Sequence, residues 1–74
     1  MVGSFADRIL SRIQGEFNAA RMELWLQVDA GRMSADEALD VLQTARGFNG
    51  WAAVDCVQQA VHRARIGAGD AERG

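Results

Sequence analysis

The sequence contains no proline, no tyrosine and no lysine, and it has a single cysteine among its 74 residues. The absence of proline favours helices, because proline breaks the interior of a helix. The lone Cys56 excludes an internal disulfide, and we expect a buried structural thiol at this position. Whatever stabilises the fold must therefore come from packing rather than from covalent cross-links.

Long apolar runs and an excess of positive charge are also missing. No stretch approaches the ~18 apolar residues that span a bilayer, and the N-terminus lacks a signal-peptide pattern, so we expect a cytoplasmic protein without a membrane contact. The formal net charge is -2 and the pI is about 5.1. This balance argues against non-specific binding of nucleic acid, whose affinity comes mainly from lysine and arginine meeting phosphates.

Hydrophobic residues make up 49% of the chain, and their spacing follows the period of a helix. A long helix is predicted from Ser4 to Asp29, with Gly15 at a point of close approach and Gly31 ending the helix in a left-handed cap. Its main apolar stripe consists of Phe5, Ile9, Leu10, Ile13, Phe17, Ala20, Leu24 and Val28.

Two shorter helices follow. The segment Ser34-Ala35-Asp36-Glu37 predicts a capping box at the start of a second helix that ends near Arg46. Its predicted apolar face consists of Ala35, Ala38, Leu39, Leu42 and Ala45. Asn49 is the predicted N-cap of a third helix that ends near Ile66, and residues 67–74 are predicted to form a flexible C-terminal tail. The expected fold is a small all-α, three-helix domain over residues 1–66.

The three helices have unequal lengths, about 39, 19 and 24 Å at ~1.5 Å per residue. Two short helices give thin cover for one long helix, and a chain of this size buries only about 60% of its unfolded surface. We therefore expect an apolar stripe to stay open at the N-terminus and to form a homodimer interface. The residues of this stripe are Phe5, Ile9, Leu10 and Ile13.

A second apolar group lies on the side of the long helix away from the main stripe. Met22, Trp25 and Leu26 have i, i+3, i+4 spacing, so this part of the helix is apolar nearly all round. Either the two short helices clasp it from both sides, or the three side chains anchor a partner protein, as tryptophan and methionine often do. In the second case Arg21, Asp29 and Arg32 would form the polar rim.

Residue patterns that support catalysis or cofactor binding are weak or missing. Cys56 and His62 do not share a helical face, and a zinc site needs about four convergent ligands. Asp36 and Asp40 are one turn apart, but acids at the start of a helix, such as Asp36 and Glu37, usually complement the helix dipole rather than bind a cation, and no glycine-rich phosphate loop occurs. We therefore expect no catalytic residue, no metal and no cofactor.

The sequence thus favours a small interaction protein that occupies the surface of a larger protein, as an inhibitor, anti-activator or adaptor. Small phage and mobile-element proteins that block host machinery are often of this kind. The alternative is a helix-turn-helix-like DNA-binding regulator, whose third helix offers Gln58, Gln59, Arg63 and Arg65. A further alternative is an acidic face that mimics nucleic acid, formed by Asp29, Asp36, Glu37 and Asp40.

Overall fold

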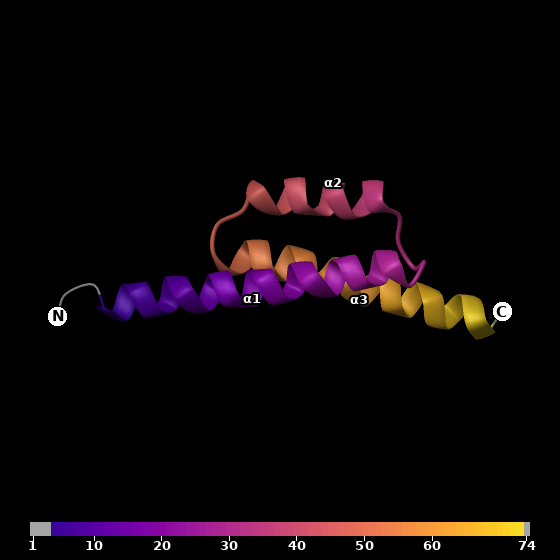
Figure 1. Ribbon diagram of the computed structural model, residues 1–74, viewed down its shortest axis with the longest axis horizontal. Coiled ribbons are helices and arrows are strands. Elements are labelled where there is room, and N and C mark those ends of the chain that lie inside the picture. The colour runs from indigo at the N-terminus through magenta and orange to yellow at the C-terminus, as the bar shows by residue number, and fades with distance from the viewer. Residues whose placement is uncertain (1–3, 74) are drawn as a thin grey trace.

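The computed structural model describes the backbone of residues 4–73 and the side chains of residues 5–67. Its three helices are α1 (Ser4–Asp29), α2 (Ala35–Arg46) and α3 (Trp51–Arg73). Helices α1 and α3 run side by side in the same direction, and α2 runs back along one side of this pair (Figure 1). The molecule is elongated, at 56 × 20 × 17 Å, because the start of α1 and the end of α3 project at opposite ends. The predicted all-α, three-helix fold is confirmed.

Helix α1 ends in the glycine cap that the sequence predicts. Gly31 has a φ of 76°, a conformation that is costly for side-chain-bearing residues. Its N–H donates to the carbonyl of Val28, and the N–H of Arg32 donates to the carbonyl of Gln27. These two hydrogen bonds form a Schellman motif, which turns the chain sharply toward α2.

The starts of α2 and α3 use different caps. Ser34 accepts a hydrogen bond on its Oγ from the N–H of Glu37 at 3.1 Å, which confirms the first half of the predicted capping box. The prediction of Asn49 as the N-cap of α3 is wrong. Gly50, at a φ of 57°, directly precedes the helix, and its carbonyl accepts from the N–H of Val54.

The core is formed by small and β-branched side chains of all three helices. Leu24 of α1 and Val54 and Val57 of α3 are fully buried. They are accompanied by the buried residues Ala20, Ala38, Ala45, Ala60 and Val61. Because four of these five are alanines, the helix backbones can approach one another closely, and the core is thin.

Three sequence predictions about individual segments need correction. Leu39 was expected on the apolar face of α2, but it is half exposed, because α2 turns its alanines toward the α1·α3 pair. Gly15 is not at a close approach within the chain, since a Cβ there would meet nothing within 4 Å. Helix α3 continues to Arg73, past its predicted end near Ile66, because adding residues to an existing helix costs far less than starting one.

Candidate protein-binding surfaces

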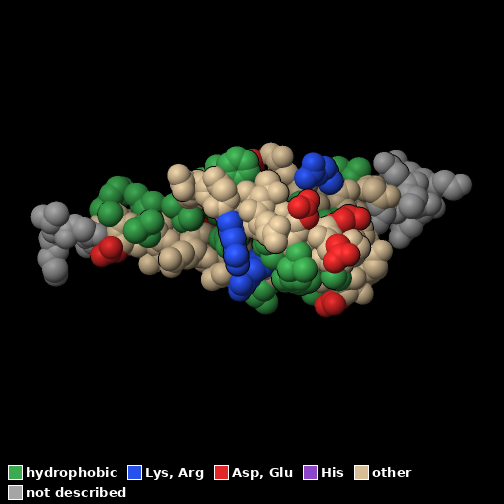
Figure 2. Space-filling model, turned by 90° about the horizontal axis from the view of Figure 1, so that it is seen from above, with side chains coloured by type: hydrophobic (Ala, Val, Ile, Leu, Met, Phe, Trp, Pro, Cys, Tyr) green, Lys and Arg blue, Asp and Glu red, His purple; other side chains and the backbone are tan. Residues whose placement is uncertain are grey.

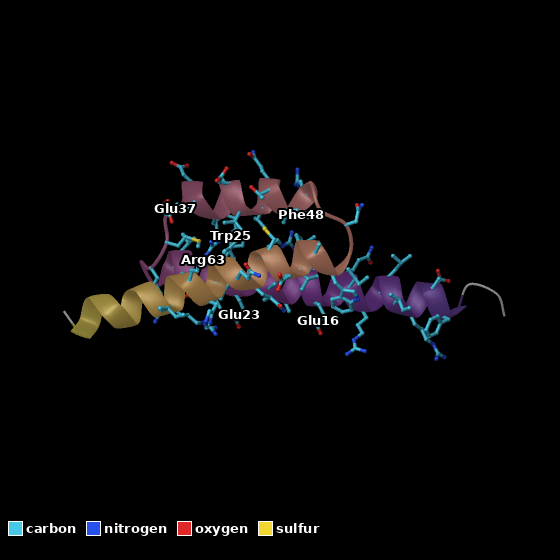
Figure 3. The ribbon with its side chains drawn as sticks, turned by 180° about the vertical axis from the view of Figure 1, so that it is seen from behind. Glu16, Glu23, Trp25, Glu37, Phe48 and Arg63 are labelled. Atoms are coloured by element: carbon cyan, nitrogen blue, oxygen red, sulfur yellow. The ribbon has the colours of Figure 1, made fainter. Side chains whose placement is uncertain are left out.

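The structure separates the three residues predicted to anchor a partner. Met22 and Leu26 lie one turn apart on α1, and their side chains are 65% and 54% exposed. Trp25 instead is half-buried and packs against the core. Figure 3 places it between α2 and the α1·α3 pair. An apolar patch of Met22 and Leu26 thus faces solvent, while Trp25 belongs mainly to the interior.

The predicted polar rim of this patch is also divided. Arg21 and Asp29 are exposed near it on α1. Arg32 donates a hydrogen bond from Nη1 to Oε1 of Gln27 at 3.1 Å. Gln27 is only 2% exposed, so Arg32 satisfies a buried amide. Arg32 therefore has a structural contact, whereas Arg21 and Asp29 are accessible.

The predicted N-terminal stripe is open over most of its length. Phe5 is 76% exposed and Leu10 57%, and Ile9 is also exposed. Ile13 is half-buried where α1 meets the turn before α3, since a Cβ at Gly50 would lie 3.7 Å from its Cδ1. Residues before Ile13 project beyond the three-helix bundle (Figure 1), and Figure 2 shows apolar side chains gathered on this projecting part.

A groove runs between α1 and α3, on the side of the pair away from α2. It has a volume of about 380 Å³ and is lined by Glu16, Ala19, Ala20, Glu23, Gln58, Val61, His62 and Arg65. Figure 3 shows Glu16 and Glu23 pointing away from α2 along this side. Glu23 forms an ion pair with Arg65 across the groove. The groove is therefore acidic along its α1 wall and apolar at its floor.

Sequence reasoning missed four exposed apolar residues. These are Leu39, Phe48, Trp51 and Ile66, each about half exposed. Phe48 lies in the turn between α2 and α3 and Trp51 is the first residue of α3, so both lie near the end of the bundle from which α1 projects. For Phe48 and Trp51, the neighbouring Gly47 and Gly50 could have indicated this exposure from the sequence, because side chains at helix ends are rarely covered on every side.

The described part of the chain offers little support for a metal site, a reactive thiol or a membrane-spanning helix. Within it no group of three or more histidine, cysteine or acidic residues is placed to hold a metal ion. His62 is exposed, and Cys56 is a half-buried free thiol rather than a fully buried one. None of the helices described is both long enough and apolar enough to cross a membrane.

Comparison of the chain with protein-family models, curated proteins and solved structures gave no significant match. The function must therefore be inferred from the exposed surfaces of the molecule.

Proposed function

We propose that this chain is a non-enzymatic protein-interaction module that binds a larger protein through Met22 and Leu26 and self-associates through the start of α1. The observation that supports this proposal is the exposure of two separate apolar surfaces on one helix. Large exposed apolar side chains that cluster, rather than occur singly, are typical of binding sites.

Each surface has the features of a different contact. Met22 and Leu26 form a compact patch with the accessible charges Arg21 and Asp29 near it. An apolar anchor with a polar rim is the usual anatomy of a protein interface. The N-terminal stripe projects from the bundle, which suits it to a second copy of the chain. By covering a surface of its partner, the module would act as an inhibitor, anti-activator or adaptor.

Affinity capture from the native host tests the partner-binding surface. The bait is the full chain as wild type, as the double variant Met22→Ser/Leu26→Ser, or as Leu39→Ser. Leu39 is a matched control because it is a similarly exposed leucine on a different helix. We expect a captured protein to bind wild type and the control, and to bind the double variant about tenfold or more weakly. Equal capture by all three, with unchanged helicity, would contradict the proposal.

A further inference from the structure

We propose that the α1·α3 groove binds the projecting start of α1 from a second copy of this chain, in an antiparallel arrangement related by a two-fold axis. This inference rests on the self-association proposed above and specifies its geometry. Each copy carries one groove and one projecting segment, so two equal contacts close a dimer and leave neither surface unused.

The groove and the projecting segment match in length. The segment before Ile13, Ser4–Arg12, spans about 13 Å at the rise of an α-helix. The α1 wall of the groove, from Glu16 to Glu23, spans about 12 Å. The segment and the groove wall therefore match to within about one residue.

The antiparallel register follows from the faces that meet. If Arg12 lies opposite Glu16 of the other copy, then Ile9 falls opposite Ala19 and Phe5 opposite Glu23. At ~100° per residue, Phe5, Ile9 and Arg12 share one face of α1. Glu16, Ala19 and Glu23 likewise share the groove wall. Ile9 therefore meets small apolar side chains.

Phe5 is the most exposed large apolar side chain among those described, and it gains most from burial. In this register its ring lies over the aliphatic stem of Glu23 and the groove floor at Val61. Long charged side chains often cover apolar groups in this way while their charged ends remain in water. The Glu23–Arg65 ion pair can therefore persist in the dimer.

Charge decides the relative direction of the two helices. Arg12 and Glu16 are both exposed. Among the described residues, the one ion pair is between Glu23 and Arg65, so Arg12 and Glu16 form none within a single copy. In the antiparallel dimer, Arg12 of each copy pairs with Glu16 of the other, which gives two equivalent ion pairs. A parallel two-fold pair would place Arg12 against Arg12 and leave both grooves empty, so charge complementarity favours the antiparallel form.

Charge reversal with mixing tests this register. Arg12→Glu alone and Glu16→Arg alone each put like charges at both contacts, so we expect each variant to self-associate at least tenfold more weakly than wild type. Mixed in equal amounts, the two variants regain opposite charges at both contacts and should form a mixed dimer. Sedimentation equilibrium gives the affinities, and native mass spectrometry identifies the mixed species. Arg46→Glu, at an exposed arginine of α2 outside both proposed surfaces, is the matched control and should dimerise as wild type does.

The outcomes separate this inference from the broader proposal. A mixed dimer that is stronger than either variant alone supports the register. Variants that dimerise like wild type and gain nothing on mixing overturn it, even though self-association itself would stand. A wild-type chain that stays monomeric also overturns it, whereas capture through Met22 and Leu26 is measured independently and would be unaffected.

Discussion

Arg32, in the turn after α1, donates a hydrogen bond from its guanidinium to the side-chain carbonyl of Gln27, which is buried in the last turn of that helix. The two residues are also joined through the backbone, since the N–H of Arg32 donates to the carbonyl of Gln27. This double contact fixes the direction in which the chain leaves α1. It therefore sets the side of the α1·α3 pair that α2 covers, and with it the side on which the groove stays open.

Removing the guanidinium should leave the Gln27 amide buried and unsatisfied. We expect Arg32→Ala to lower the free energy of unfolding by about 1–3 kcal/mol, as for other buried polar groups that lose a partner. The double variant Arg32→Ala/Gln27→Leu should recover most of this loss, because it removes both polar partners. Urea denaturation of the two variants checks the prediction. No difference between them would show that Gln27 is not the group that Arg32 stabilises.

The Ser34 hydroxyl caps the start of α2. Ser34→Ala should lower the free energy of unfolding by about 1 kcal/mol, because the N–H of Glu37 loses its acceptor. Ser34→Asp supplies another acceptor at the same place and should behave like wild type. Thermal denaturation followed by circular dichroism compares the three chains. An equal loss in both variants would argue against a capping role for this side chain.

Replacing Gly15 of α1 by alanine and replacing Gly31 of its C-terminal cap by alanine should change the free energy of unfolding in opposite directions. Gly15 lies inside the helix with open space around its Cα, so Gly15→Ala should raise the free energy of unfolding by about 0.5–1 kcal/mol. Gly31 has a positive φ, so Gly31→Ala should lower it by about 1–2 kcal/mol. Both values come from urea titration of the purified chain. A destabilising Gly15→Ala would mean that another surface contacts α1 at this position.

Leu24 and Met22 lie two residues apart on α1 but differ completely in burial. Leu24 is 0% exposed at the centre of the core, so Leu24→Ala should cost about 2–5 kcal/mol, which is enough to unfold a domain this small. Met22→Ala should change stability by less than about 0.5 kcal/mol, as most surface substitutions do. Far-UV circular dichroism distinguishes the two outcomes. Similar losses in both variants would contradict the assignment of Met22 to an open surface.

Much of the secondary structure could be predicted from the sequence, because the signals are local. The period of apolar residues defines α1, and the glycine at position 31 and the serine at position 34 define the turn after it. The C-terminal end of α3 could not be predicted in this way. Gly67 and Gly69 weaken the helical pattern, but a helix that already exists can be extended without the cost of a new nucleus.

The arrangement of the helices around α1 was harder to predict. The periodicity of apolar residues identifies the apolar face of a helix, but it does not identify the helix that packs against this face. The spacing of Met22, Trp25 and Leu26 predicted that they share one face of α1. It did not decide whether the other helices cover that face. The structure shows that α2 covers the side of Trp25 and leaves the other two exposed. The small side chains Ala38 and Ala45 determine this outcome, since they allow α2 to approach closely with only one edge of its apolar face.

If the apolar surface of α1 binds protein and the projecting start of α1 binds a second copy, the wild-type chain must self-associate. Sedimentation equilibrium of the wild-type chain, over a wide range of concentrations, tests this most directly. We predict that the average mass rises with concentration from that of one 8.0 kDa chain to that of two, and that Phe5→Ser shifts this transition to higher concentration. A mass of one chain at every concentration would contradict self-association through α1.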